Sequence, residues 1–316
     1  MEYIVAFLCI LEQMKKKDEQ KQKVLVIVGP TASGKSDLAV FLAKQFDGEV
    51  VSADSRQVYR GLDIGTGKIT KREMQGVPHH LLDVASAKRS YTVAHYKRDG
   101  AKAIDDILRR GKIPIICGGT GFYIQALVDD LLLPDVKPNI KLRKQLEELS
   151  CEELFMRLKR LDKARAKTID AKNPYRLIRA IEIAEALGKV PPFKKNTPYN
   201  PLIIGIEVSK ETLEERIHLR LMKRLKRGML AEIKTLHENG LSWKRMEELG
   251  LEYRYTAQYL QGKFTKKEFQ ETLEQEIKKY AKRQMTWFKK DKRINWIPFD
   301  KQNEALALTK NFLKRK

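Results

Sequence analysis

The stretch that decides the fold is residues 23–36, which read Lys-Val-Leu-Val-Ile-Val-Gly-Pro-Thr-Ala-Ser-Gly-Lys-Ser. Residues 24–28 form a short apolar run of the kind that a strand buried on both faces requires. Gly29 and Gly34 then bracket a tight turn of the form G-x-x-x-x-G-K-[ST]. Apolar residues share one face of a helix predicted over residues 37–44. Strand, glycine-rich turn and helix in this order predict a P-loop.

A P-loop binds phosphate because consecutive backbone N–H groups point at one anion, in a conformation that glycine adopts at low cost. Lys35 adds a mobile positive charge, and the start of the following helix adds unpaired N–H groups. The Ser36 hydroxyl is the candidate ligand of Mg²⁺. The predicted binding site for a di- or triphosphate consists of Gly29, Pro30, Thr31, Ala32, Ser33, Gly34, Lys35 and Ser36. The motif does not identify the rest of the bound molecule.

Length and composition set the broad class. With 316 residues the chain can form one large domain or two smaller ones. Its 3 cysteines are too few and too scattered for a disulfide framework or a metal site, so we expect a reducing, cytoplasmic compartment. No stretch approaches the apolar length of a membrane span, and no membrane contact is expected. We expect a monomer.

The net charge of +22 points to a polyanionic partner, because an enzyme for small molecules has no evident use for so much self-repulsion. The alternative is a solvated lysine surface. The positive charge is concentrated in three segments. Residues 157–179 contain nine basic and two acidic residues, residues 216–227 contain six basic and no acidic residues, and residues 278–293 contain eight basic and one acidic residue. The last cluster includes Trp287 and Phe288, which singly are explained by core packing. Together, the clusters favour a polyanionic partner, and basic residues mixed with aromatic ones suit a single-stranded or looped nucleic acid.

The rest of the chain predicts an α/β fold with a P-loop NTPase-like core and a mostly parallel sheet. Further strands are predicted at 49–52, 113–117, 202–208 and 296–298, and helices at 93–108, 212–237, 246–261 and 266–289. The predicted parts are an N-terminal extension (1–22), a first part of the core (23–134), an inserted helical lobe (135–200), a mostly helical second part of the core (201–299) and a basic C-terminal tail (300–316).

Asp54 is the candidate general base. It follows the predicted strand 49–52, and ligands of parallel α/β sheets bind where the strands end. A carboxylate that caps a turn is the equally open alternative. Thr120, in a second glycine-rich turn, is suited to orient a substrate group. His79 and His80 have no third ligand at metal spacing and are interpreted as structural or weak substrate contacts.

Arg176 and Arg179 lie three residues apart and share one face of a predicted helix, which Asn173 caps and Pro174 opens. Two guanidinium groups on one face can bind phosphates or a base edge. The alternative is a solvated face on which these arginines pair with Glu182 and similar acids.

Six motifs together resemble the bacterial tRNA dimethylallyltransferases, the isopentenyltransferases that modify N6 of the adenosine on the 3′ side of the anticodon. The motifs occupy residues 29–36, 52–66, 76–83, 118–123, 174–182 and 282–288. The block Asp54-Ser-Arg-Gln57, coupled to this P-loop, is the most specific. The sequence departs from the family pattern in three places. Gly67 stands where the family usually has alanine, residues 249–255 differ from the family's usual sequence, and the N-terminal extension has no expected counterpart.

The resemblance implies that the P-loop holds dimethylallyl diphosphate with Mg²⁺, and that Lys35 stabilises the departing pyrophosphate. It also implies that Asp54 takes the proton from the adenine amine and that Thr120 positions that base. Arg220, Arg224 and Arg283 are candidates for assisting pyrophosphate departure. The implied contacts with the tRNA anticodon loop are Asp54, Ser55, Arg56, Gln57, Tyr175, Arg176, Leu177, Ile178, Arg179 and Arg283.

Two other functions remain open at the level of sequence. A P-loop kinase of a nucleotide or small metabolite shares the fold and also places an acid near the phosphates, but it leaves the basic insertion unexplained. A GTPase-like nucleic-acid-binding module is the weaker alternative, because the chain lacks an Asn-Lys-x-Asp element to read guanine.

Overall fold

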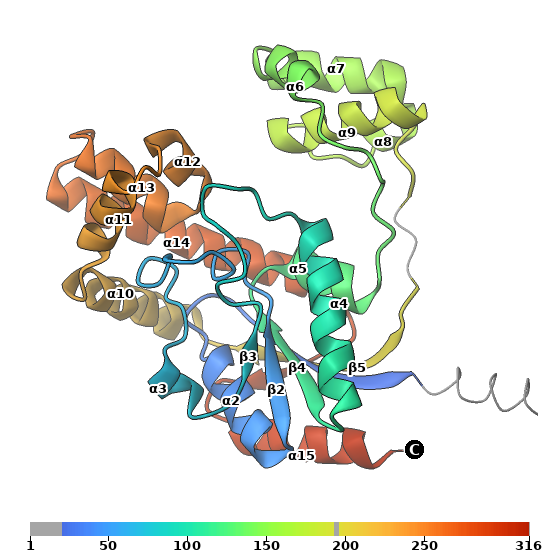
Figure 1. Ribbon diagram of the computed structural model, residues 1–316, viewed down its shortest axis with the longest axis vertical. Coiled ribbons are helices and arrows are strands. Elements are labelled where there is room, and N and C mark those ends of the chain that lie inside the picture. The colour runs from blue at the N-terminus through green and yellow to red at the C-terminus, as the bar shows by residue number, and fades with distance from the viewer. Residues whose placement is uncertain (1–20, 193–195, 316) are drawn as a thin grey trace, which may run out of the picture. The chain divides into compact units, whose positions relative to one another are not determined.

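The computed structural model describes residues 21–192 and 196–315. Its centre is a 6-stranded sheet in the order β3-β2-β4-β1-β5-β6, in which every neighbouring pair is parallel (Figure 1). The strands are β1 (Gln22–Val28), β2 (Gly48–Ser52), β3 (His79–His80), β4 (Ile113–Gly118), β5 (Tyr199–Glu207) and β6 (Ile294–Pro298). The predicted α/β fold with a parallel sheet is confirmed, and β1 lies at its centre.

Helices cover both faces of the sheet. Alternate residues of each strand point to opposite sides, so each strand contributes side chains to both faces. Val24, Val26 and Val28 of β1 belong to a core cluster with helices α4 (Val93–Arg109) and α5 (Gly121–Val128). Leu25 and Ile27 belong to a second cluster with α2 (Lys35–Gln45) and α15 (Gln302–Lys314). The apolar run after Gln22 is therefore buried on both sides, as the sequence predicts.

A third core cluster joins the C-terminal helices to the segment after β2. These helices are α10 (Lys210–Lys226), α11 (Met229–Glu238), α12 (Trp243–Glu248), α13 (Leu251–Leu260) and α14 (Lys266–Phe288). Tyr253 and Phe269 are fully buried there and pack with Val58 and Leu62. The helical region thus fixes the loop that leads away from the carboxyl end of β2.

Two predicted helices are each divided in two. The predicted helix 212–237 ends before Gly228, whose φ of +96° belongs to the left-handed region, and a new helix starts after it. The predicted helix 246–261 is likewise interrupted at Gly250, with a φ of +129°. Helical spacing of apolar residues continues across both glycines, but a residue at positive φ cannot continue a right-handed helix. The single helices were wrong predictions.

Residues Leu131–Asn196 form a compact unit of their own, separate from the unit that contains the sheet. In its described part it consists of helices α6 (Ile140–Glu147), α7 (Cys151–Leu161), α8 (Lys163–Ala166) and α9 (Pro174–Leu187). Its core includes Leu146, Leu154, Leu158 and Leu177, which are fully buried. Among the described residues of the whole chain, no helix has the length and apolar character needed to cross a membrane.

A buried carboxylate joins β2 to the edge strand β3 and to the end of α4. Glu49 on β2 is 1% exposed and accepts hydrogen bonds from Nη2 of Arg110 at 2.7 Å and from the ring of His80 at 2.8 Å. The hydrogen bond from Arg110 is the main reason that the pKa of Glu49 falls to about 2, and His80 adds to it against the opposing effect of burial. His80 therefore has the structural role that its sequence context favours.

We predict that Glu49→Gln lowers the free energy of unfolding at pH 7 by about 1–2 kcal/mol, allowing for the solvent around Arg110. Because folding lowers the pKa of Glu49, its stabilisation is present above the unfolded pKa near 4.5 and is lost as the pH falls toward 2. Urea unfolding at several pH values should show the gap between the two proteins closing below about pH 4.5. A gap that stays constant at low pH would contradict this role.

Candidate active site

The loop between β1 and α2 has the form of a phosphate cradle. Gly34, at a φ of +91°, precedes the first turn of α2, and the side chain of Lys35 folds back to donate to the carbonyl oxygen of Pro30 at 3.1 Å. Burial lowers the pKa of Lys35, and the charge of Arg220 acts in the same direction. Ser33 Oγ is buried with no hydrogen-bond partner among the described residues. An anion at this loop would supply the missing partner.

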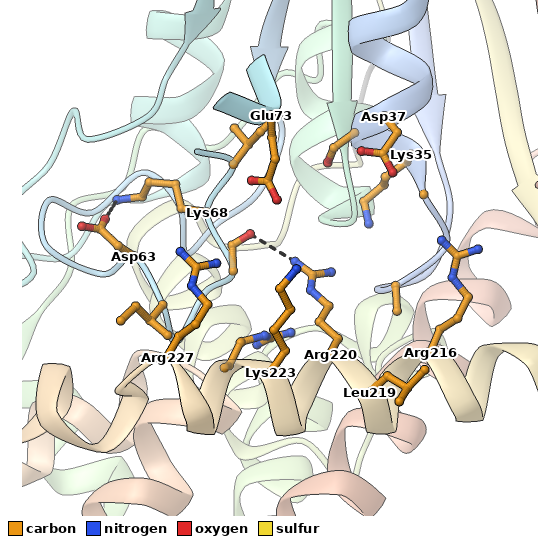
Figure 2. A pocket seen from close by; sticks show the side chains of 17 residues that line it. Lys35, Asp37, Asp63, Lys68, Glu73, Arg216, Leu219, Arg220, Lys223 and Arg227 are labelled. Carbon is orange, nitrogen blue, oxygen red and sulfur yellow. Dashed lines mark hydrogen bonds and ion pairs between the residues drawn. The ribbon is translucent and has the colours of Figure 1, made fainter. Parts of the chain in front are cut away.

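Two cavities meet at the P-loop. Lys35, Ser36, Ile69 and Arg220 line both. The larger cavity, of about 370 Å³, extends along α10 and is the one seen in Figure 2. The smaller, of about 70 Å³, includes Asp54. A group bound at Lys35 can therefore be reached from both sides.

Asp54 is both a turn carboxylate and a residue of the smaller cavity. Its Oδ1 accepts hydrogen bonds from the backbone N–H groups of Arg56 at 2.8 Å and Gln57 at 3.4 Å. No hydrogen bond within residues 21–192 and 196–315 engages its Oδ2. The cavity that it lines also contains Thr31, Lys35 and Gln57. One carboxylate oxygen thus fixes the turn, and the other is available to a substrate.

Thr120 does not line either cavity. Its Oγ1 accepts a hydrogen bond from the backbone N–H of Ser55 at 3.0 Å, and its own N–H donates to the carbonyl oxygen of Ala53 at 3.1 Å. The second glycine-rich turn is therefore tied to the segment that carries Asp54. In this arrangement Thr120 positions the Asp54 turn.

Gln284 on α14 is a site residue to which the sequence reasoning assigned no role. Its Oε1 accepts from the N–H of Thr31 at 2.8 Å, and its Nε2 donates to the carbonyl oxygen of Gly119 at 2.9 Å. One buried side chain thus bridges the P-loop and the second glycine-rich turn. A Cβ at Gly119 would lie 2.2 Å from Gln284 Nε2, so any larger residue there would displace the bridging amide. The motif at 282–288 was the available signal.

The three arginines proposed to assist a leaving group are not equivalent. Arg220 lines both cavities and donates to the carbonyl oxygen of Gly67 at 3.1 Å; burial and the neighbouring Arg224 lower its pKa to about 10. Arg224 is paired with Glu252 at 2.7 Å. Arg283 lines neither cavity, and its guanidinium lies over the ring of Tyr280, 5.8 Å from the ring centre.

Arg216 is a further cation that sequence reasoning did not single out. It lines the larger cavity beside the P-loop, where a Cβ at Gly34 would lie 3.4 Å from its Nη2. Its position one turn before Arg220 on α10 places both guanidinium groups on the same helix face. Figure 2 shows both side chains extending from α10 toward Lys35.

Glu232 on α11 holds the loop that lines both cavities. Its Oε2 accepts from the N–H groups of Asp63 at 3.1 Å and Ile64 at 2.6 Å, and its Oε1 accepts from Gly65 N–H at 3.0 Å and from the hydroxyl of Tyr253 at 2.8 Å. The next residues of this loop contribute Thr66 to the smaller cavity and Gly67 to the larger. Sequence reasoning missed Glu232 because its partners are backbone groups distant along the chain.

The residues proposed to bind tRNA in the helical unit divide into surface and core. Tyr175 is 79% exposed, and Arg176 lies 3.7 Å from Asp170. Leu177 and Ile178 are buried in the core of the unit, where they hold α9 in place. Arg179 donates to Glu182 Oε2 at 3.1 Å and to the carbonyl oxygen of Val136 at 2.9 Å. Arg179 is therefore paired with Glu182, which is the alternative to phosphate binding that the sequence left open.

No cluster of three or more metal-ligating histidine, cysteine or acidic side chains occurs among the described residues. Neither His79 nor His80 therefore belongs to such a group. The residues at the P-loop instead fit an ion held by one hydroxyl and by oxygens of a bound phosphate, as at the Ser/Thr of other P-loops. Ser36, exposed at the start of α2, can supply that hydroxyl.

The IPP transferase family model matches residues 57–291, which is more than half of the chain. The chain belongs to the IPP transferase family. A family member from Treponema denticola, tRNA dimethylallyltransferase 2, is 45% identical over 287 residues, covering 88% of this chain and 96% of its own. The tRNA dimethylallyltransferase of Anoxybacillus flavithermus is 40% identical over 291 residues, covering 90% and 92%.

Solved structures of IPP transferases share this fold. The full-length tRNA isopentenylpyrophosphate transferase of Bacillus halodurans superposes with a TM-score of 0.71 at 35% identity, covering 93% of this chain and 96% of that one. A eukaryotic dimethylallyltransferase acting on tRNA superposes with a TM-score of 0.76 at 27% identity, covering 92% and 79%. The P-loop NTPase-like core expected from the sequence is thus confirmed.

We predict that Glu232→Gln loosens the loop that lines the two cavities, because an amide cannot accept all the hydrogen bonds that a carboxylate accepts. Amide hydrogen exchange at residues 63–65 should accelerate by about tenfold, the effect of losing one to two such bonds. Glu238→Gln is the matched control, since Glu238 is exposed on the same helix and only approaches Lys234 at 3.9 Å. Equal exchange rates in both variants would contradict the anchoring role.

Proposed function

We propose that this protein transfers a dimethylallyl group from dimethylallyl diphosphate to N6 of the adenosine on the 3′ side of the anticodon in tRNA, releasing pyrophosphate. One observation carries the proposal: Asp54 and the P-loop residues Lys35 and Ser36 line the same cavity. An acid beside a diphosphate cradle suits alkylation of an amine, in which a proton must leave as the new bond forms. Membership of the IPP transferase family supports the same reaction.

The P-loop would hold the diphosphate of the donor. Backbone N–H groups around Gly34 and the charge of Lys35 bind its oxygens, and Ser33 Oγ gains the partner that it lacks. Ser36 would hold Mg²⁺, which would supply charge neutralisation for the departing oxygens. Lys35 and Arg220 stabilise the negative charge that grows as the carbon–oxygen bond breaks.

The acceptor amine would reach the donor through the smaller cavity. At about 70 Å³ this cavity is much smaller than the one along α10, so we propose that it receives the amine edge of the base. The adenine must first be extruded from its stack. N6 then bonds to C1 of the dimethylallyl group, the C1–O bond breaks with its electron pair going to pyrophosphate, and Asp54 Oδ2 takes the N6 proton.

Recognition of tRNA would use the Asp54 turn and the helical unit. Ser55, Arg56 and Gln57 are partly exposed next to Asp54. In the helical unit, Tyr175 and Arg176 are at the surface and are the contacts we propose there, with Arg179 contributing through its exposed part. Leu177 and Ile178 would act by supporting this face of α9. We further propose that the protein acts as a cytoplasmic monomer, with Arg283 as an additional tRNA contact.

The reaction is tested by incubating the protein with dimethylallyl diphosphate, Mg²⁺ and unmodified tRNA, followed by mass spectrometry of the nucleosides. We expect N6-dimethylallyladenosine in the anticodon loop. Asp54→Asn should reduce turnover about 10²–10⁴-fold, because the amide cannot accept the proton. Its Oδ1 still accepts the hydrogen bonds from Arg56 and Gln57, so the turn and the affinity for tRNA should be preserved.

Asp54→Ala is the companion variant. It removes both the proposed base and the oxygen that accepts hydrogen bonds from Arg56 and Gln57. Near-normal turnover by Asp54→Asn would show that Asp54 only stabilises the turn and is not the base. Transfer of phosphate from ATP to a small acceptor, without alkylation of tRNA, would instead support the kinase alternative.

A further inference from the structure

The larger cavity contains more positive charge than one diphosphate at the P-loop requires. Its cationic lining residues are Lys35, Lys68, Arg216, Arg220, Lys223, Arg224 and Arg227. Two of these are neutralised, because Lys68 is paired with Asp63 at 2.6 Å and Arg224 with Glu252 at 2.7 Å. None of the other five has an ion pair in the part of the chain that the structure describes. The acids Asp37 and Glu73 offset only part of this charge.

Four of the cavity's cations form a row along α10 and its C-cap residue. Arg216, Arg220, Lys223 and Arg227 follow one another at intervals of four, three and four residues, which places them on one helix face. The row spans about 16 Å at the rise of an α-helix. Figure 2 shows all four side chains on the side of α10 that faces the cavity.

The row divides into an inner and an outer pair. Arg216 lies beside Gly34, and Arg220 is close enough to Lys35 to lower its pKa. Lys223 and Arg227 lie farther along the helix, where their charges act on the Glu73 carboxylate. That carboxylate is already engaged, accepting hydrogen bonds from the N–H and the hydroxyl of Thr70, both at 2.8 Å. The outer pair therefore has donors available for another anion.

We propose that Lys223 and Arg227 form an outer subsite for a diphosphate group, which receives pyrophosphate when it leaves the P-loop. The inference rests on the proposed function, because it takes the P-loop as the inner diphosphate site. Released pyrophosphate faces the charges of Lys35 and Arg220, which would hold it and slow turnover. A second cationic position in the same cavity lets the product leave in two shorter steps.

The geometry favours a small anion over an RNA phosphate as the occupant. The outer pair lines the same cavity as Gly34, Lys35 and Ser36, so anything that leaves the P-loop by this side passes it. Asp54, the residue that marks the acceptor side, lines the other cavity and not this one. The donor and product side is thus distinct from the side proposed for the nucleobase.

Calorimetric titration of the full chain with pyrophosphate in the presence of Mg²⁺ tests the subsite. We expect two binding sites in the unmodified protein. The double variant Lys223→Gln/Arg227→Gln should keep the inner site, while the outer affinity falls by about tenfold or more, as for the loss of charge-assisted hydrogen bonds. Lys35→Met should weaken the inner site and retain the outer one. Lys226→Gln is the matched control, because Lys226 is an exposed lysine of α10 that does not line the cavity.

Kinetics gives a second readout. The double variant should show a burst of one prenylated tRNA per enzyme followed by a steady rate about fivefold lower, because product release has become slow, whereas Lys226→Gln should match the unmodified protein. A single pyrophosphate site in the unmodified protein, or two unchanged sites in the double variant, would overturn the proposal. The proposal would also be overturned if the double variant bound tRNA more weakly but bound pyrophosphate as before, because Lys223 and Arg227 would then be RNA contacts. Because calorimetry requires no prenyl transfer, failure of the proposed reaction would be seen separately by nucleoside mass spectrometry.

Discussion

Three loops meet in this protein because β1, β2 and β4 are parallel neighbours, and parallel strands place their carboxyl ends at one edge of the sheet. The P-loop follows β1, the Asp54 turn follows β2, and the turn with Gly119 follows β4. Double burial places β1 inside the sheet, since its alternate side chains belong to two different core clusters. Everything that the site can do depends on that shared edge.

Side chains from helices α11 and α14 and from the turn after β4 then fix the loops at this edge. Gln284 joins the P-loop to the Gly119 turn, and Thr120 joins that turn to the segment carrying Asp54. Glu232 holds the loop that supplies Thr66 and Gly67 to the two cavities. Such preorganisation matters for a charged leaving group, because dipoles and charges already in place need not reorganise during the reaction.

Part of the positive charge of this chain is concentrated in the larger cavity and part lies inside the helical unit. The six basic residues of 216–227 include the row that lines the larger cavity. Among the described residues, Arg224 is the one of these six that has an ion pair. In the helical unit, Arg143 and Arg179 surround the buried Glu182 and stabilise the fold of that unit. Arginine thus lines a cavity in one unit and supports the internal structure of the other.

Much of the fold and part of the site could be predicted from the sequence. The apolar run before Gly29 and the G-x-x-x-x-G-K-S motif are local patterns, and local patterns predict the strand, the P-loop and the position of Asp54 at the sheet edge. Gln284 and Glu232 could not be found this way, because they bind backbone groups more than one hundred residues away. The breaks at Gly228 and Gly250 were hidden because helical periodicity continues across them.

The central claim is that Asp54 and the P-loop act on two substrates bound at once in adjoining cavities. The most direct measurement is a crystal structure of the protein with tRNA and an unreactive thio-analogue of dimethylallyl diphosphate. The account predicts the diphosphate on residues 34–36 and adenine N6 within hydrogen-bonding distance of Asp54 Oδ2. An adenine that remains stacked in its loop, or an N6 directed away from Asp54, would contradict it.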